Sequence, residues 1–238
     1  MRSKFFDKET HYHLGRPDHC ASVKTLLAQH FDADKICLEI GAGNGRGTKI
    51  LADYFAKVIA VEPVAELAVL GQGVFALDNV ELQTIPIEEM SELEFDYLIC
   101  FQATHWFYRS AQYQKLYARA QKPVLDIKSF AVTLDDRDFI IDLFETYQAK
   151  DIFLGVDFPK QLIFEDSYEA DFSVEQVAHA ICSTSWIDHN NFEEIFDAIQ
   201  QRYSGNDILE RVTTLVYEVD GIDKLDSNNW QRKNKYQS

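Results

Sequence analysis

Four glycines and one acid stand close together in the stretch "CLEIGAGNGRGT", which follows directly on an apolar run. The glycines are Gly41, Gly43, Gly45 and Gly47. The acid, Glu39, precedes the first of them by two residues. Glycine lets the backbone adopt positive φ and lets a ligand approach without a Cβ in the way. We therefore expect a turn that holds a nucleotide-type cofactor, and the acid and the spacing must decide which one.

The spacing of the glycines disfavours a dinucleotide. A nicotinamide- or flavin-binding turn requires Gly-x-Gly-x-x-Gly, whose third glycine allows close packing of helix on strand. Counted from Gly41, Arg46 stands where that third glycine should fall. Glu39 also occupies the strand end, where a dinucleotide fold usually keeps an apolar residue. An NAD(P)-dependent oxidoreductase is therefore a disfavoured alternative.

A second acid, Glu62, ends the next apolar run, "KVIAVEP". Its two carboxylate oxygens suit a ribose 2′,3′-diol, and Glu39 can attract a cationic ammonium, directly or through water. An adenosine that carries a cationic amino-acid tail and no phosphates fits this pair of acids. S-adenosylmethionine is that ligand. We expect it to contact Glu39, Gly41, Ala42, Gly43, Gly45, Glu62 and Pro63.

The elements that must position these residues alternate between two patterns. Strand-like runs cover residues 35–40, 57–63, 80–85, 94–102 and 124–130, and helical patterns cover residues 46–55, 64–73 and 109–121. Several of the strand-like runs are apolar throughout, which is typical of parallel strands buried on both faces. Strands that alternate with helices indicate βαβ units, so the sequence predicts an α/β fold.

The second half of the chain is less regular. A helical stripe covers 135–148, and residues 161–166 and 211–219 read as strands. Ser173 and Asn191 each begin a capping-box arrangement ahead of an apolar helix. Nothing marks a domain boundary, and we expect one domain over residues 1–238. Its expected parts are an N-terminal helical lid (1–34), a cofactor-binding core (35–131), substrate-side helices and last strands (132–222) and a polar tail (223–238).

These motifs together resemble the class I S-adenosylmethionine-dependent methyltransferases. The resemblance rests on Glu39-Ile-Gly-Ala-Gly-Asn-Gly45, on Glu62 and on "EFDYLICFQATHWF", in matching order over roughly residues 5–130. Within that superfamily the chain looks like the trans-aconitate methyltransferase-like group of small-molecule enzymes. The features shared with that group are Tyr12, Arg16-Pro17 and His105-Trp106-Phe107.

The resemblance implies a doubly wound, Rossmann-like fold with a seven-stranded, mostly parallel sheet and residues 211–219 as an antiparallel last strand. It also implies that Ile87 and Glu88 flank the adenine and that Phe101 to His105 line the methyl-donor end. One departure concerns the adenine loop, where Ile85-Pro86 replaces the Gly-Asp that the group usually carries. An acidic contact to the adenine amino group is therefore not expected here.

Four residues are candidates for the substrate side: Tyr12, Arg16, His105 and Trp106. His105 would contact cofactor or substrate, or act as a general base, and Trp106 would close an apolar wall. Tyr12 and Arg16 would form part of a lid over the cofactor, with Arg16 near a carboxylate. The alternative is that all four are packing residues at a strand end and on an N-terminal helix.

Composition narrows the function classes further. The net charge of -16 and the pI near 4.7 disfavour nucleic acid and anionic membranes as partners. Four scattered cysteines and no apolar leader indicate reduced thiols in the cytoplasm. The histidines lack companions at a ligand spacing, so we expect no metal. The hypothesis is O-methylation of a small carboxylic acid, and the alternative from another class is a cofactor-binding regulator without catalysis.

Overall fold

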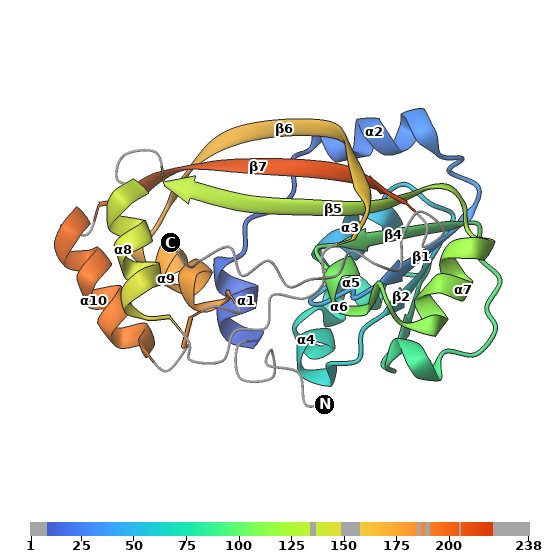
Figure 1. The fold of residues 1–238 in the computed structure, drawn as a ribbon, viewed down its shortest axis with the longest axis horizontal. Helices are drawn as coiled ribbons and strands as arrows, with labels where there is room; N and C mark the ends of the chain where they lie inside the picture. The colour runs from blue at the N-terminus through green and yellow to red at the C-terminus, as the bar shows by residue number, and fades with distance from the viewer. Residues whose placement is uncertain are drawn as a thin grey trace, which may run out of the picture.

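The computed structural model describes residues 9–133, 137–148, 158–184, 187–188, 191–204 and 206–220. Within these ranges strands and helices alternate through the first half of the chain, as the sequence predicts (Figure 1). The expected polar tail, residues 223–238, lies outside the described residues, and so do residues 1–8 of the expected lid.

The described residues form a sheet of seven strands. The strands are β1 (Ile36–Ile40), β2 (Lys57–Val61), β3 (Val80–Gln83), β4 (Tyr97–Phe101), β5 (Gln121–Thr133), β6 (Lys160–Phe172) and β7 (Ile208–Val219). Their order across the sheet is β3-β2-β1-β4-β5-β7-β6. The run from β3 to β5 is parallel, whereas β7 pairs antiparallel with both β5 and β6. This confirms the predicted doubly wound, mostly parallel sheet and its antiparallel last strand.

The central strands are apolar throughout because both faces of the sheet are covered. Successive side chains of a strand point to opposite faces. In β1, Leu38 packs in one buried cluster with Tyr113 of α7, and Cys37 packs in another with Leu27 of α2 and Leu51 of α3. The helices of this half are α2 (Ser22–His30), α3 (Arg46–Ala52), α4 (Ala65–Leu70), α5 (Gln72–Phe75), α6 (Thr104–Phe107) and α7 (Ala111–Arg119), with a 3₁₀ turn, η1, at Ile87–Glu89.

The last three strands are longer than the sequence indicates. β5 pairs with β7 from Leu125, opposite Glu218, to Thr133, opposite Glu210. The strands extend beyond the parallel sheet toward a second group of helices (Figure 1). That group consists of α1 (Glu9–Gly15), α8 (Arg137–Thr146), α9 (Val174–Cys182) and α10 (Phe192–Tyr203). Helices α8, α9 and α10 share a third buried cluster with the strand ends.

The two expected capping boxes have different outcomes. Ser173 Oγ accepts from Gln176 N–H at 3.1 Å, and Gln176 Oε1 accepts from Ser173 N–H at 3.0 Å, so the box at α9 is confirmed. At α10, Asn191 makes no side-chain cap hydrogen bond. Ser173 has the extended backbone that aims a cap at the helix, with ψ 156°, whereas Asn191 has ψ 18°. The expectation of a capping box at Asn191 was therefore wrong.

Helix α1 joins the two halves of the molecule. Its last residue, Gly15, lies directly against the backbone of α9, where a Cβ would collide with Ala180 N and with the carbonyl carbon of His179. One turn earlier, His11 Nδ1 and His179 Nδ1 are hydrogen-bonded at 2.7 Å. The absence of a side chain at Gly15 therefore sets how closely the N-terminal segment approaches the second helical group.

We predict that Gly15→Ala lowers the free energy of unfolding by about 1–3 kcal/mol, because overpacking of this contact must push α1 away from α9. Urea unfolding monitored by circular dichroism measures it. Gly73→Ala is the matched control, since a Cβ there meets no atom within 4 Å. In the helix α5 that change should be neutral or stabilising by up to about 1 kcal/mol. Equal effects of the two variants would contradict the packing argument.

Candidate functional site

The glycine turn between β1 and α3 has the geometry that its sequence predicts. Gly41, Gly43 and Gly45 have φ of +77°, +58° and +82°. Gly41 N and Ala42 N both donate to the carbonyl of Val61, at 2.8 and 3.1 Å, which ties the turn to the end of β2. The ends of the two strands therefore meet at the turn, where open α/β sheets bind ligands.

Gly47 allows the close helix–strand packing that the third glycine allows in a dinucleotide-binding turn. A Cβ on Gly47 would collide with the ring of Phe101 and would lie 2.6 Å from Glu39 Oε1. Helix α3 can therefore pack against β4 only because this position lacks a side chain. The closeness arises one residue after the place where the dinucleotide spacing requires it, and Arg46 is free for another contact.

Glu39 is a fully buried acid at the end of β1. Its Oε2 accepts a hydrogen bond from Thr48 Oγ1 at 2.6 Å, and its Oε1 is buried without a hydrogen-bond partner among the described residues. Burial raises the pKa of this carboxyl to about 8, against a smaller opposing effect of Thr48. An unpaired buried carboxyl oxygen beside a glycine turn is a receptor for a cation or a hydrogen-bond donor.

Glu62 follows β2 and turns its carboxylate back toward the glycines. Gly43 N–H donates to Oε2 at 2.7 Å, and Val64 N–H donates to Oε1 at 2.9 Å. Burial raises the pKa of Glu62, while these two backbone hydrogen bonds lower it. Each oxygen keeps a second lone pair, so the carboxylate is held in place and can still accept from a diol.

The N-terminal segment covers the glycine turn. The ring of Tyr12 lies 3.6 Å from the position of a Cβ on Gly43, and the Arg16 guanidinium lies 5.5 Å from the centre of the Tyr12 ring. Burial raises the pKa of the Tyr12 hydroxyl and lowers that of Arg16. Arg46 fastens this cover, because its guanidinium donates to the carbonyls of His13 and Arg16.

A small pocket lies between the cover and the turn. Its lining residues are Tyr12, Arg16, Pro17, His19, Gly41, Ala42, Asn44, Arg46, Gly47, Phe101 and Gln102. The structure thus brings together Tyr12, Arg16, Gly41, Ala42 and Phe101 from the expected set. Glu39 and Glu62 lie directly behind this pocket, through their contacts with Gly47 and Gly43.

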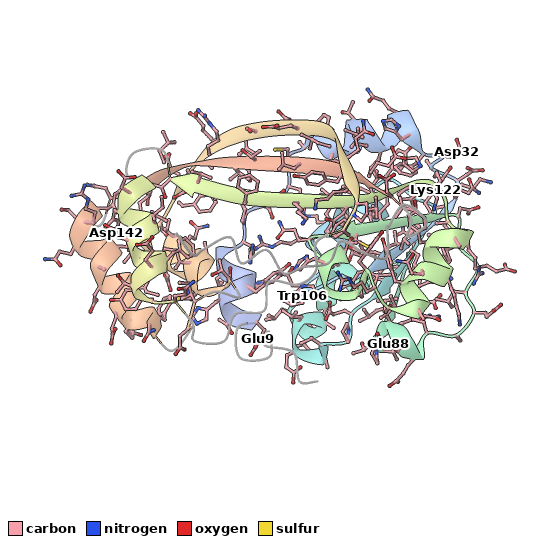
Figure 2. The ribbon with its side chains drawn as sticks, viewed as in Figure 1. Glu9, Asp32, Glu88, Trp106, Lys122 and Asp142 are labelled. Carbon is pink, nitrogen blue, oxygen red and sulfur yellow. The ribbon has the colours of Figure 1, made fainter. Side chains whose placement is uncertain are left out.

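Other expected residues do not line the pocket. Ile87 is buried in the core and Glu88 is exposed, both in η1. Pro63 is exposed after Glu62. Trp106 is labelled near the centre of the view in Figure 2, in the short helix α6. Their assigned roles at the adenine and the substrate remain predictions.

His105 lies in the short helix α6, with its ring 4.6 Å from that of Trp106. Its Nδ1 is buried without a hydrogen-bond partner among the described residues. Burial lowers the pKa of His105 to about 4, and the cations Lys128, Lys160 and Arg16 lower it in addition. The imidazole is therefore neutral at pH 7 and is surrounded by positive charge, in a chain whose net charge is -16.

Two polar residues of the pocket were not named individually as site residues: Gln102, which the resemblance includes only in the range Phe101 to His105, and His19. Gln102 follows β4 and has φ +56°, a conformation that non-glycine residues rarely adopt and that occurs at ligand sites. Its side chain accepts from Arg16 at 3.4 Å and donates to the carbonyl of Ser129. His19, the other residue, is hydrogen-bonded to Ser129 Oγ at 2.6 Å. Its position two residues after Arg16-Pro17 was the available signal.

The comparisons with known proteins agree with this geometry. Residues 38–124 match the family model described as "Methyltransferase domain". Over 112 residues the chain is 31% identical to a Dictyostelium discoideum protein named as an inferred methyltransferase, a match that covers 44% of this chain and 41% of that protein. The chain thus spans less than half the length of this curated relative.

Among solved structures, the chain resembles a protein of Anaeromyxobacter dehalogenans described as an inferred type II methyltransferase. The TM-score is 0.61 at 18% identity, over 84% of this chain and 95% of that one. The fold is therefore the Rossmann-like methyltransferase fold. The family match places residues 38–124 of this chain, which include the glycine turn, within a methyltransferase domain model. Among the described helices, none is long and apolar enough to cross a membrane.

We predict a pH signature for the buried carboxyl of Glu39. Its pKa rises from 4.5 to about 8 on folding, so between these values the folded chain holds a proton that the unfolded chain has released. The stability from this group is complete below about pH 4.5 and falls as pH rises, by up to about 1.4 kcal/mol per pH unit. Glu39→Gln should abolish that fall. The free energy of unfolding of the variant should therefore rise relative to that of the wild type as the pH approaches 8.

Urea unfolding at several values between pH 5 and pH 8 measures the difference between the two proteins. Glu81→Gln is the control, because Glu81 is an exposed acid whose pKa is lowered by its hydrogen bond from Lys57. A constant difference between wild type and Glu39→Gln across this range would mean that Glu39 is already ionised in the folded chain.

Proposed function

We propose that this chain transfers the methyl group of S-adenosylmethionine to a small molecule, and that the acceptor is the oxygen of a carboxylate. The observation that carries the proposal is the pair of buried acids at adjacent strand ends. Glu39 and Glu62 flank one turn whose three glycines have positive φ. This pair of acids can accept hydrogen bonds from an ammonium and from a ribose diol. Two carboxylates would repel a pyrophosphate.

The residues present fit the cofactor by two structural criteria. Glu39 Oε1 is a buried oxygen without a partner among the described residues, and a donor such as the cofactor's ammonium would satisfy it. The turn at Gly43 presents backbone without a Cβ, and Glu62 is already held beside it by the Gly43 N–H. Glu62 would therefore receive the ribose hydroxyls without first having to be ordered.

An anionic acceptor is supported by the cations near the pocket. Arg16 lines the pocket, and its Nε is buried without a hydrogen-bond partner among the described residues. Burial lowers the pKa of Arg16 because it disfavours the charged guanidinium, and a bound anion would offset this cost. A cation that faces a pocket in a strongly acidic chain is suited to a carboxylate substrate. The earlier resemblance to the trans-aconitate methyltransferase-like group points to the same acceptor class.

The mechanism assigns positioning to the protein. The cofactor supplies a methyl group already activated by the positive charge on sulfur. A carboxylate acceptor is ionised at neutral pH and needs no base. Arg16 would hold the acceptor, and the cover formed by Tyr12 and Arg46 would exclude water from the line of transfer. Alignment of this kind supplies roughly 7–11 kcal/mol of the barrier.

A cytoplasmic location belongs to the same proposal. The four cysteines, Cys20, Cys37, Cys100 and Cys182, are all free and buried. A set of unpaired thiols suits a reducing compartment, where the cofactor is also expected.

Calorimetric titration with S-adenosylhomocysteine, with NADH as the control ligand, tests the cofactor. We expect micromolar binding of the first and none of the second. Glu62→Ala should abolish binding, because it removes the diol acceptor and leaves the Gly43 and Val64 N–H groups unpaired. Glu66→Ala, on the first turn of α4, is the control that should bind normally. Binding of NADH alone would withdraw the assignment.

His105→Ala distinguishes the acceptor classes. We predict that it lowers single-turnover rates far more for a hydroxyl acceptor, which needs a base, than for a carboxylate, which does not. Single-turnover assays with phenol and with tricarballylate as acceptors measure this difference. Equal losses on both would show that His105 has no role as a base.

A further inference from the structure

A chain of hydrogen bonds runs from the buried sheet into the pocket and ends at His19. Cys20 N–H donates to Thr214 Oγ1 at 2.9 Å. Thr214 Oγ1 and Ser129 Oγ are 2.7 Å apart, and Ser129 Oγ and His19 Nδ1 are 2.6 Å apart. Ser129 and Thr214 stand directly opposite each other on β5 and β7, so the strand register creates the chain.

The direction of this chain follows from the one donor that cannot reverse. The backbone N–H of Cys20 can only donate, so Thr214 Oγ1 must accept from it. Thr214 is fully buried, and its hydroxyl hydrogen needs an acceptor. The described residues provide Ser129 Oγ for this hydrogen.

If Thr214 donates to Ser129, then Ser129 donates to His19 Nδ1, and every hydrogen in the chain has an acceptor. The reverse direction would leave the hydroxyl hydrogen of Thr214 buried and unpaired among the described residues, which is unfavourable. The forward direction makes Nδ1 the acceptor, so the neutral ring carries its proton on Nε2.

The place of the ring shows where this proton points. His19 lines the pocket together with Arg16, and its ring centre lies 4.7 Å from that of Phe101 at the end of β4. Nδ1 is taken by Ser129, and no hydrogen bond of Nε2 is found within the part of the chain that the structure describes. Burial lowers the pKa of His19 to about 4, so the ring remains neutral and keeps this tautomer at pH 7.

We propose that His19 is a substrate-binding residue that donates its Nε2–H to the acceptor carboxylate, and that Ser129 and Thr214 are positioning residues that fix this tautomer. The proposal rests on the proposed function and gives its acceptor a second contact, beside the guanidinium of Arg16. It also gives the site a preference. With its proton on Nε2, the His19 ring can donate a hydrogen bond to an ionised carboxylate. The same nitrogen cannot take a proton from a hydroxyl acceptor.

The tautomer is measured by two-dimensional ¹H–¹⁵N NMR of the imidazoles of the intact chain, with His19→Gln identifying the resonance. We expect a protonated Nε2 and an unprotonated Nδ1 at pH 7. Ser129→Ala should shift His19 toward the other tautomer, because the donor to Nδ1 is lost. Ser167→Ala is the matched control, since Ser167 makes a similar hydroxyl pair with Thr213, at 3.0 Å, and should leave the ring unchanged. A protonated Nδ1 in the wild type would overturn the proposal.

The carboxylate that His19 meets is identified with three probes followed at the Nε2 proton. They are S-adenosylhomocysteine, 5′-methylthioadenosine, which lacks the amino-acid tail, and tricarballylate added to protein saturated with S-adenosylhomocysteine. The proposal is supported by a shift of this proton in the wild type on addition of tricarballylate, together with a calorimetric affinity for tricarballylate that His19→Phe at least halves and His19→Gln retains. A shift with S-adenosylhomocysteine but neither with methylthioadenosine nor with tricarballylate would assign His19 to the cofactor's own carboxylate and overturn it.

The tautomer measurement also separates this proposal from the function on which it rests. If S-adenosylhomocysteine does not bind the wild type, the proposed function fails, whatever the state of His19. If it binds and tricarballylate leaves the Nε2 proton unmoved, the function stands and the role of His19 fails. Circular dichroism of each variant excludes unfolding as the cause of a lost shift.

Discussion

The turn after β1 is packed from three sides, and the site depends on that closeness. Phe101 and Ala103 press on it from the end of β4, the carboxylate of Glu62 reaches it from β2, and Tyr12 covers it. A side chain at Gly41 or Gly47 would force these segments apart. The same packing removes water from Glu39 and so raises its pKa. One steric constraint therefore creates both the space for a ligand and the unusual chemistry of the acid behind it.

Much of this arrangement could be predicted because its signals are local. The central strands of the sheet are buried on both faces, so each is a short run that is mostly apolar. Glu39 and Glu62 could be paired because parallel strands end at a common edge, and the register places Glu39 beside Ala60, two residues before Glu62. The positive φ of Gly41, Gly43 and Gly45 could be predicted because glycine is the residue that adopts it most readily.

The features that escaped prediction depend on contacts between distant residues. β6 continues to Phe172 although polar residues such as Glu165 and Glu169 interrupt its apolar pattern, because backbone pairing with its neighbour β7 holds it in place. His19 and Ser129 are 110 residues apart in sequence, and Ser129 and Thr214 are 85 apart. Only the register of β5 with β7 brings the two hydroxyls together, and no local spacing encodes it.

The placement of α1 between two partners has a consequence for how such a protein can diversify. One side of α1 abuts the backbone of α9 through Gly15, and its C-terminal end is fastened to the cofactor turn by Arg46. Under the proposed function, a change of the second helical group for a new acceptor would therefore also move the cover over the cofactor. Selection for a different acceptor would then first change the affinity for the methyl donor. Acceptor specificity and donor affinity would therefore evolve together rather than independently.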